Sequence, residues 1–324
     1  MTPRATTALI LLGAVLCLLP GISLLHWPGL PAWGGLLAGA ALGLTLGNPH
    51  LVRTRKATPR LLAWSVVGLG AAMNLKTVAR VGLQGFGYTA VGITVALALG
   101  LVLGRLLKVP RIAALLTSAG TAICGGSAIA ALAPVIHAEE EDTSVALGTV
   151  FLLNAAALLI FPAIGHALHL GERAFGLWAA LAIHDTSSVV GAAAGYGPEA
   201  LTVATTTKLA RALWILPLTL GAGFLFVRAK ESGEAAPKAK RPWFILGFLA
   251  AAALVTYFPE LQSAGRMLSE AAKRALVLTL FLLGLGLSRE SLARVGFRPF
   301  LHGTVLWVLI GTGTLAAIRM GWIH

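Results

Sequence analysis

The stretch Ala122-Ile-Cys-Gly-Gly-Ser-Ala128 interrupts an otherwise apolar segment with small and polar residues. A second stretch, Ala182-Ile-His-Asp-Thr-Ser-Ser188, interrupts another apolar segment in the same way when the two are aligned at their Ala-Ile pairs. Glycines and hydroxyls at such positions free backbone groups from helical bonding, which a membrane tolerates only where protein or a water-lined cavity satisfies them. The two stretches therefore predict two broken helices and a binding or transport site between them.

Composition indicates that the whole chain lies in a lipid bilayer. Of its 324 residues, 57% are hydrophobic and only 11% are charged, and the mean hydropathy is +0.85. A soluble domain usually carries about 25% charged residues. We therefore expect an all-α polytopic membrane protein in which residues 1–324 form a single integral membrane domain. The net charge of +13 would suggest nucleic-acid binding in a soluble protein, but here its distribution along the chain matters more.

The cysteines and the N-terminus add two smaller expectations. Cys17 and Cys124 each lie within an apolar run, so the sequence predicts no disulfide framework. The N-terminal segment, Arg4 followed by apolar residues 8–19, is interpreted as a first membrane helix rather than as a signal peptide.

Apolar length gives a first count of spans, because a membrane helix needs about 20 apolar residues. The chain contains eleven candidates, several of them short: 8–25, 31–47, 60–75, 86–107, 111–135, 143–168, 174–196, 199–227, 243–258, 272–288 and 301–319. Tryptophans near several of these ends are typical of interfacial anchors: Trp27, Trp33, Trp178, Trp243 and Trp307.

The basic residues test this order of spans. If the 48–60 loop is cytoplasmic and the spans alternate from there, 17 of the 25 lysines and arginines are cytoplasmic and 6 are outside. Lys208 and Arg211 stay within a span. The positive-inside rule then favours a cytoplasmic N-terminus and an outside C-terminus. We expect the protein to lie in the plasma (inner) membrane. The same alternation puts Arg173 in the cytoplasm and the acidic run 139–142 outside. The polar segment 228–241 is expected to be a flexible cytoplasmic linker between two blocks of helices.

An internal similarity suggests inverted repeats. Residues 70–86 resemble residues 284–300, and both copies contain Ala-Arg-Val-Gly where one span ends and the next begins. The order of spans makes the two copies run in opposite directions, as in many secondary transporters. A chance match of Leu-, Gly- and Ala-rich sequence is the alternative. The two polar breaks conflict with this symmetry, because spans 111–135 and 174–196 would run parallel. Either one span is miscounted or the breaks are not symmetry partners.

Four ionisable side chains are expected near the middle of the membrane. His184 and Asp185 lie about ten residues from the end of their span, roughly 15 Å into a ~30 Å core. Lys208 and Arg211 lie at a similar depth in the next span. A lone charge at this depth is costly, so the four groups should face one another or a wet cavity. One negative and two positive charges leave a positive excess, to which a protonated His184 would add.

A positive excess with hydroxyls and free backbone amides suits an anion. We expect Lys208 and Arg211 to bind it, and His184 and Asp185 to carry a coupling proton or to neutralise the empty site. The complete set of candidate binding residues is Thr121, Cys124, Gly125, Gly126, Ser127, His184, Asp185, Thr186, Ser187, Lys208 and Arg211. Asn74 and Asn154 are weaker candidates. Structural alternatives stay open: a Lys208–Asp185 salt bridge, a His184 bonded to a carbonyl, a Cys124 that only packs, and serines that join helices.

Four segments carry a resemblance to a known family. They are Ser118–Ile129 with its Ile-Cys-Gly-Gly, Ile183–Ala193 with its Ile-His-Asp, Lys208–Arg211 followed by Leu216-Pro217, and Pro134-Val135. From about residue 30 onward the chain resembles the YeiH-like sulfate exporter family. That resemblance implies a relative of the bile acid, arsenite and cation/proton antiporter-like transporters, with a mobile core of broken helices and a scaffold that often dimerises. Where the family has a His-Glu pair, this chain has His184-Asp185, which keeps a carboxylate but shortens its reach.

These observations predict a secondary active transporter, an exporter of a small anion such as sulfate, another oxyanion or a sulfonate, that works by alternating access. The expected partners are the anion, a proton or sodium ion, the bilayer and a second copy of the chain; no cofactor, metal or nucleic acid is expected. No nucleotide-binding motif occurs, so ATP drive would require a partner. The alternatives are a cation/proton antiporter that uses Asp185, a passive channel, and an intramembrane serine hydrolase. An enzyme is disfavoured because adjacent His184 and Asp185 would point about 100° apart on a helix.

Overall fold

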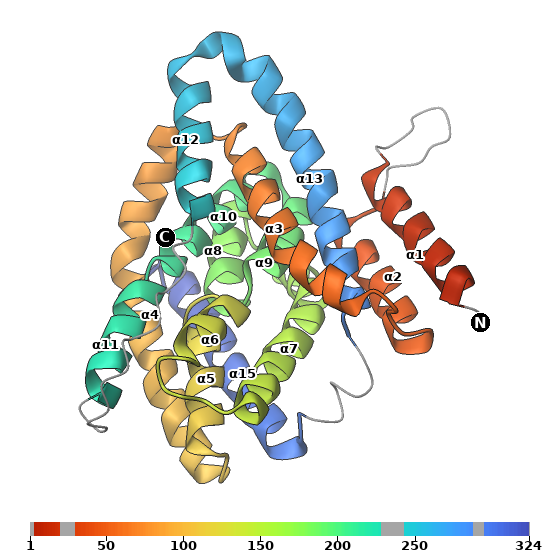
Figure 1. Ribbon diagram of the computed structural model, residues 1–324. Helices are drawn as coiled ribbons and strands as arrows, with labels where there is room; N and C mark the ends of the chain where they lie inside the picture. Colours follow the sequence, from red (N-terminus) through yellow and green to blue (C-terminus); the bar gives the residue numbers. More distant parts are fainter. Residues whose placement is uncertain (1–2, 20–29, 228–242, 288–294, 324) are drawn as a thin grey trace. The chain divides into compact units, whose positions relative to one another are not determined.

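The computed structural model describes residues 3–19, 30–227, 243–287 and 295–323. Within these ranges every regular element is a helix, as the composition predicts (Figure 1). The helices form two compact units: unit 1 comprises Met1–Arg80 and Pro242–Glu290, and unit 2 comprises Val81–Arg241 and Ser291–His324. The predicted linker at 228–241 and part of the predicted repeat at 284–300 lie outside the described residues.

Unit 1 is built around one long helix, α13. Its elements are α1 (Pro3–Leu18), α2 (Ala32–Thr45), α3 (Leu51–Gly70), the first residues of α4 (Leu75–Leu106), α12 (Trp243–Tyr257), the 3-10 turn η2 (Pro259–Leu261) and α13 (Gln262–Leu285). A Cβ on Gly35 of α2 would lie only 2.8 Å from the carbonyl oxygen of Val277, so glycine allows α2 to approach α13. α1 adds Ile10 and Cys17 to a buried cluster with Phe281 of α13.

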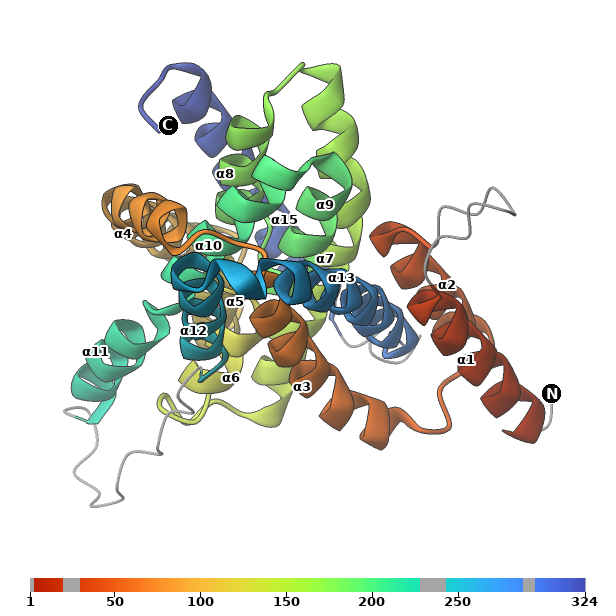
Figure 2. The same ribbon diagram turned by 90° about the horizontal axis from the view of Figure 1, so that it is seen from above.

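Several helices of unit 2 pack along α7. The positions of the other elements are therefore described relative to the two ends of α7, its Glu140 end and its Ala167 end. The elements of unit 2 are the rest of α4, α5 (Arg111–Ala122), α6 (Gly126–Leu132), α7 (Glu140–Ala167), α8 (Glu172–Ala182), α9 (Thr186–Tyr196), α10 (Pro198–Ala212), α11 (Ile215–Val227) and α15 (Phe297–Arg319). α8, α9 and α10 lie side by side in both views (Figures 1 and 2).

α5 and α6 form a helical hairpin, here called hairpin 1, whose tip is residues 123–125. α5 begins at the Glu140 end of α7, where the Asp142 carboxylate accepts a hydrogen bond from the backbone of Ala113. The hairpin reaches Val150, whose Cγ1 would lie 3.2 Å from a Cβ on Gly125. Since α7 itself starts at Glu140, the chain must return the length of ten helical residues, about 15 Å, before α7 begins. α6 makes most of that return.

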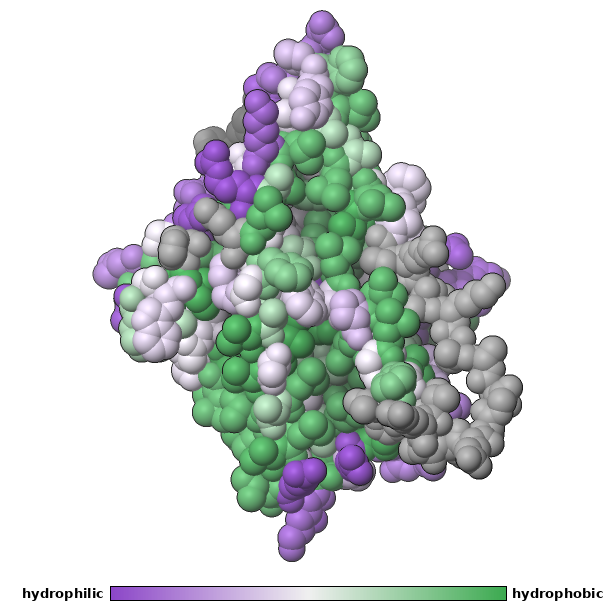
Figure 3. Space-filling view, turned by 90° about the vertical axis from the view of Figure 1, so that its left-hand side faces the viewer, coloured by the Kyte–Doolittle hydropathy of each residue, from purple (hydrophilic) through white to green (hydrophobic). Residues whose placement is uncertain are grey.

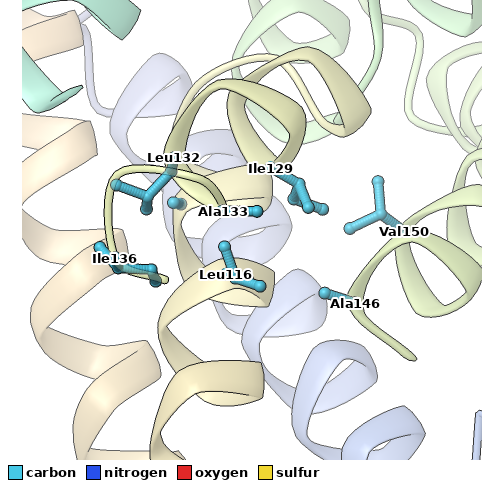
Figure 4. Packing of buried hydrophobic residues seen from close by; sticks show 8 residues of the cluster. Leu116, Ile129, Leu132, Ala133, Ile136, Ala146 and Val150 are labelled. Carbon is cyan, nitrogen blue, oxygen red and sulfur yellow. The ribbon is translucent and has the colours of Figure 1, made fainter. Parts of the chain in front are cut away.

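Buried side chains along α6 show the same reversal (Figure 4). One cluster joins Leu116 of α5 with Leu132 and Ile136, which belong to α6 and the turn after it, and with Val150 of α7. If α6 continued in the direction of α5, Leu116 and Leu132 would lie about 24 Å apart and would belong to different clusters. Hairpin 1 therefore enters and leaves unit 2 at the Glu140 end.

α8 and α9 form a second hairpin, hairpin 2, which enters from the opposite end. At the Ala167 end, a Cβ on Gly165 of α7 would lie 2.6 Å from Cδ2 of Phe175 and 2.9 Å from Cε2 of Tyr196, one residue from each arm. Its tip, residues 183–185, lies halfway along α7, where two of its amides bond to Asn154. Hairpin 2 therefore runs from the Ala167 end to the middle of α7 and back.

Stacked aromatic rings hold the arms of hairpin 2 to each other and to α7. The rings of Phe175 and Tyr196 stack with centroids 3.7 Å apart, and the ring of His166 of α7 also stacks on Tyr196, with centroids 4.3 Å apart. Nearer the tip, Phe161 of α7 stacks on Trp178 of α8 at 4.2 Å. In hairpin 1, aliphatic side chains rather than rings join α5 and α6 to each other and to α7.

Other helices of unit 2 connect its two ends. α10 runs in the same direction as α8, and a Cβ on Gly176 would lie 3.1 Å from Cβ of Val203. α11 continues toward the Glu140 end, where Leu218 packs against the hairpin 1 cluster. α15 ends near the Ala167 end, where Arg319 Nη2 donates to the Leu168 carbonyl oxygen over 3.3 Å. α10 and α11 together therefore run antiparallel to α7.

In the described part of the chain, three helices are long and apolar enough to cross a membrane: Gly85–Leu106 within α4, Glu140–Ala167 and Phe297–Arg319. Two bent helix pairs, Leu51–Gly70 with Leu75–Leu83 and Trp243–Tyr257 with Pro259–Leu285, raise this number to five if each pair is one span. Figure 3 shows a face on which hydrophobic side chains dominate, as lipid contact requires. The chain is an all-helical membrane protein, but eleven separate spans are not reproduced.

Two of the predicted spans, 111–135 and 174–196, are wrong as single crossings because each folds back on itself. The predicted alternation fails with them. The acidic run 139–142 lies at the same end of α7 as Arg111, and Arg173 lies at the other end, where α8 begins. Apolar length cannot distinguish a broken crossing from a hairpin of the same length, since both bury the same residues.

Candidate functional site

The two polar stretches break their helices at matching positions. α5 ends at Ala122 and α6 begins at Gly126, while α8 ends at Ala182 and α9 begins at Thr186. Each break is thus three residues long, in the register that the Ala-Ile alignment predicts. Gly125 has a backbone φ of +64°, a left-handed conformation that side chains with a Cβ rarely adopt. The predicted breaks are confirmed at both places.

The tips of the two hairpins meet near the middle of α7. A Cβ added to Gly125 would lie 3.3 Å from Cβ of Asp185 and 3.4 Å from its backbone nitrogen. Val150 touches the tip of hairpin 1, and Asn154, one turn further along α7, bonds to the tip of hairpin 2. Asn154 is the fifteenth of the 28 residues of α7, so the tips lie at half the length of that helix.

Asn154 joins α7 to the tip of hairpin 2. Its Oδ1 accepts hydrogen bonds from the backbone amides of His184, at 3.1 Å, and Asp185, at 3.3 Å. Its Nδ2 is buried without a hydrogen-bond partner. The orientation of this amide is fixed by chemistry, because turning it over would point an NH₂ group at two N–H donors.

Asp185 caps the start of α9. Its carboxylate oxygens accept from the backbone amide of Ser188 at 3.3 and 3.4 Å, and one of them accepts from the Ser187 hydroxyl. A carboxylate at the first turn of a helix is stabilised by the unpaired amides and by the helix dipole. Asp185 therefore completes the local structure of the tip.

Arg211 of α10 joins the C-terminal ends of both entering helices. Its Nε donates to the carbonyl oxygen of Ala122 at 2.6 Å, and its Nη2 donates to that of Thr121 at 3.3 Å, both at the end of α5. Its Nη1 donates to the carbonyl oxygens of Ala180, at 3.4 Å, and Leu181, at the end of α8. One guanidinium thus satisfies carbonyls that neither helix can satisfy internally.

Lys208, one turn earlier on α10, bonds to hairpin 2 alone. Its Nζ donates to the carbonyl oxygens of Ile183 at 2.7 Å and Ala180 at 3.3 Å. The side chains of Lys208 and Arg211 are 0% and 1% exposed. Their charges face the C-terminal ends of α5 and α8, each equivalent to roughly half a negative charge. The predicted Lys208–Asp185 ion pair does not form, because Lys208 Nζ bonds to the two carbonyl oxygens instead.

His184 is the least satisfied group at the tips. It is 1% exposed, and neither ring nitrogen has a hydrogen-bond partner. Its ring centroid lies 6.4 Å from that of Trp307 on α15, whose Nε1 is also buried without a partner. Thr205 and Thr206 of α10 have buried hydroxyls in the same condition. Unpaired polar atoms are therefore concentrated around this part of unit 2.

The remaining predicted residues also lie at the two tips, with different exposure. Thr121 is buried and donates its hydroxyl to Thr117 O at 3.0 Å, so that group is used within α5. Cys124 is a buried free thiol. Gly126 and Ser127 open α6, and Ser127 is exposed. Thr186 and Ser187 are buried in the first turn of α9. In the described residues, no group of His, Cys, Asp and Glu could hold a metal ion.

Two sequence interpretations need correction. Trp178 was expected at an interface, but it is 3% exposed and donates from Nε1 to the Gly311 carbonyl oxygen over 2.8 Å. Trp307 packs beside His184 instead of marking a membrane boundary. Asn154, a weaker candidate from the sequence, bonds directly to the tip of hairpin 2, and it is the only amide side chain in the span predicted at 143–168. An isolated amide side chain in an otherwise apolar helix is the feature of the sequence that indicates a functional residue at this position.

Comparisons with known proteins identify the family of this chain. A family model described as conserved hypothetical protein 698 matches residues 11–303. A UPF0324 membrane protein of Bdellovibrio bacteriovorus is 55% identical over 313 residues, which cover 97% of this chain and 94% of that protein. A UPF0324 membrane protein of Geobacter sulfurreducens is 47% identical over 287 residues, with 89% and 90% covered.

A third relative, a UPF0324 membrane protein of Bacteroides thetaiotaomicron, is 46% identical over 303 residues, which cover 90% of this chain and 89% of that one. No solved structure matches. The resemblance noted from the sequence points to the same family. With the family model matching most of its length and these relatives aligned nearly end to end, the chain belongs to the UPF0324 family of membrane proteins.

Proposed function

We propose that this membrane protein is a secondary transporter that exports a small anion, sulfate or a related oxyanion or sulfonate, by alternating access. The observation that carries the proposal is the meeting of two hairpin tips, entering from opposite ends of α7, beside Gly125 and Asp185. Interrupted helices whose ends meet at half depth are the usual setting of substrate sites in secondary transporters. The opposite entry of the hairpins also agrees with an inverted repeat.

An anion fits the unpaired groups at the tips better than a cation does. The oxygen of Asn154 already accepts two amides, and both oxygens of Asp185 accept bonds within hairpin 2. The groups left without partners include Asn154 Nδ2, which can only donate, and the His184 ring. A cation needs free oxygen ligands, whereas an oxyanion accepts from donors.

Lys208 and Arg211 have a second role in this proposal. The Arg211 guanidinium has five N–H groups, of which four donate to carbonyl oxygens. The Lys208 ammonium has three, of which two donate to carbonyl oxygens. Each side chain therefore has one donor left for the anion. Most of their hydrogen bonding holds the hairpins together, and their charge supplies the field that favours an anion.

We propose a location in the plasma (inner) membrane with the Glu140 end of α7 in the cytoplasm. Arg105, Lys108 and Arg111 lie in or beside the short turn between α4 and α5, at that end. Arg173 and Arg319 lie at the other end. The positive-inside rule then puts the C-terminus, which follows α15, outside. The N-terminus is proposed to be cytoplasmic, as the sequence predicts. Unit 2 would be the moving core and unit 1 the scaffold, with a homodimer as the expected assembly.

The test is flux into liposomes that contain the purified protein. We expect saturable uptake of labelled sulfate, driven by a proton or sodium gradient, and at least a tenfold loss with Arg211→Ala. An Arg211→Ala protein that carries sulfate normally contradicts the assigned site. If no sulfate, sulfonate or other oxyanion moves with the wild-type protein, the proposed function is wrong.

The second candidate is a cation/proton antiporter, favoured by the partly buried Asp185 at the meeting point of the tips. Sodium-dependent proton flux that persists in the absence of any permeant anion supports it. We expect no hydrolase activity, because Asp185 bonds to Ser187 and Ser188 while His184 bonds to neither. Labelling of a serine by a fluorophosphonate would contradict that expectation.

A further inference from the structure

Asn154 occupies a costly position. It lies 3% exposed in the middle of an apolar helix, and its Nδ2 has no partner. A buried polar group left without a hydrogen bond costs about 1–3 kcal/mol, so such a group in a folded protein calls for an explanation. Its other half is fully used, since Oδ1 accepts from the His184 and Asp185 amides. The two bonds accepted by Oδ1 explain why a residue that holds the tip lies here. They do not explain why Nδ2 is left without an acceptor.

The free donor is held rigidly at the place where the tips meet. The two bonds to Oδ1 fix the plane of the amide, and Nδ2 therefore has one direction. The neighbouring Val150, one turn before Asn154 on the same face of α7, touches Gly125 of the other tip. Nδ2 is thus held by α7 and hairpin 2, one helical turn from the α7 residue that touches hairpin 1.

We propose that Asn154 is a substrate-contacting residue that donates a hydrogen bond from Nδ2 to an oxygen of the transported anion. This inference rests on the proposed function, and it adds a substrate-contacting residue and a criterion for which substrates can bind. The substrate must present a lone pair to Nδ2, which an oxyanion or a sulfonate does and a metal cation or an ammonium does not. Asn154 also keeps the tip of hairpin 2 in register while the anion is bound.

The variant Asn154→Asp separates the two halves of the side chain. An ionised aspartate still accepts from both tip amides, but it has no donor and adds a negative charge beside the anion. A protonated aspartate regains an O–H donor. The charged and titratable groups around it are His184 and Asp185 on hairpin 2, and Lys208 and Arg211 on α10. Because these groups are also present in the wild-type protein, each measurement is the ratio of variant to wild type at one pH.

The experiment measures the sulfate-induced rise in unfolding temperature of detergent-purified protein, and sulfate flux in liposomes, at pH 8 and pH 5. For Asn154→Asp we expect an unfolding temperature without sulfate close to that of the wild type. We expect sulfate affinity at pH 8 to fall at least tenfold, the effect of losing one hydrogen bond to a charged group, and to recover at pH 5. Thr149→Val is the matched control, since it removes a buried hydroxyl of α7 that bonds only to Val145 O of its own helix. It should bind and carry sulfate like the wild type.

Three outcomes overturn the inference. If Asn154→Asp binds sulfate like the wild type at pH 8, the residue only positions the tip or holds a water, and the proposed function is unaffected. If Asn154→Asp does not fold, Asn154→Ser takes its place, because its hydroxyl lies one bond short of both amide atoms and leaves no donor at the position of Nδ2. A serine variant with wild-type sulfate affinity is then the contrary result. If the wild-type protein neither binds nor carries any anion, the proposed function fails and the inference fails with it.

Discussion

Gly125 and Asp185 lie in contact where the two hairpins meet, so close that a Cβ on Gly125 would come within 3.3 Å of Cβ of Asp185. They stand at the same place in their own stretches, as the last residue before α6 and before α9. The contact joins two segments that are 60 residues apart in the sequence and enter unit 2 from opposite ends. The arrangement around it leads to four predictions.

Gly125→Ala should separate the tips. Alanine in the left-handed conformation costs about 1–2 kcal/mol, and its methyl group would also press on Val150 at 3.2 Å. We expect a lower unfolding temperature in detergent and a loss of sulfate flux of at least tenfold. Gly195→Ala is the control, because that position in α9 has open space around it and alanine favours a helix. Equal behaviour of the two variants would rule out the tip contact.

Arg211→Lys should loosen both hairpins although it keeps the charge. A lysine ammonium cannot reach the ends of α5 and α8 at the same time, as the planar guanidinium does. Several buried carbonyls would lose their donors, at a cost of about 1–3 kcal/mol each. We expect faster amide hydrogen exchange in peptides from both 119–125 and 179–185.

Lys208→Met provides the contrast for that measurement. Lys208 bonds only to carbonyls at the end of α8, so its loss should accelerate exchange in 179–185 and leave 119–125 unchanged. Lys273→Ala, at an exposed ion pair of unit 1, should change neither peptide. If Arg211→Lys affects only one of the two peptides, the guanidinium does not join the hairpins.

The side of the membrane from which single introduced cysteines are labelled should show whether the two segments fold back as hairpins. Both natural cysteines are buried, so a bulky charged thiol reagent should reach only an added one. We expect Lys108→Cys and Glu141→Cys to be labelled from the same side of the membrane, and Glu199→Cys from the other. Glu199 lies at the Ala167 end, where its amide donates to Glu172 Oε2 over 2.8 Å. Labelling of Glu141→Cys from the side opposite to Lys108→Cys would mean that 111–135 crosses the membrane.

Phe175→Ala should weaken hairpin 2 strongly. The ring is 0% exposed and stacks on Tyr196, so its removal leaves a cavity that should cost about 3–5 kcal/mol. We expect a clear fall in unfolding temperature and faster exchange in peptides from 186–196. Phe297→Ala removes the same ring from a site that is 77% exposed and should have little effect. A similar response of both variants would contradict a structural role for the stack.

The sequence predicted the two seven-residue stretches in which the helix breaks lie, but it did not predict the shape of the breaks. The Ala-Ile pairs at 122 and 182 mark helix ends in both cases because the same local chemistry, small and polar residues after an apolar run, interrupts both helices. Direction is a different matter. Whether the chain continues or turns back at Gly125 depends on contacts such as those of Leu116 with the α6 side chains. A hydropathy count contains no information about contacts between residues that are distant in the sequence.

The conflict over symmetry follows from the same error. Counting 111–135 and 174–196 as crossings made the two breaks parallel, whereas hairpins that enter from opposite ends are inverted relative to each other. The partners of Lys208 and Arg211 were also beyond prediction, because backbone carbonyls carry no signature in a sequence.

The different contacts of the two hairpins make them unequal in local stability. Stacked rings hold the arms of hairpin 2 together at Phe175 and Tyr196 and pack Trp178 on α7, whereas hairpin 1 has a returning helix of seven residues held by aliphatic side chains. Segments with fewer buried contacts open at lower free energy than the rest of a fold. Opening fluctuations should therefore begin in α6, which makes the Glu140 end the easier route by which a solute reaches His184 and Asn154.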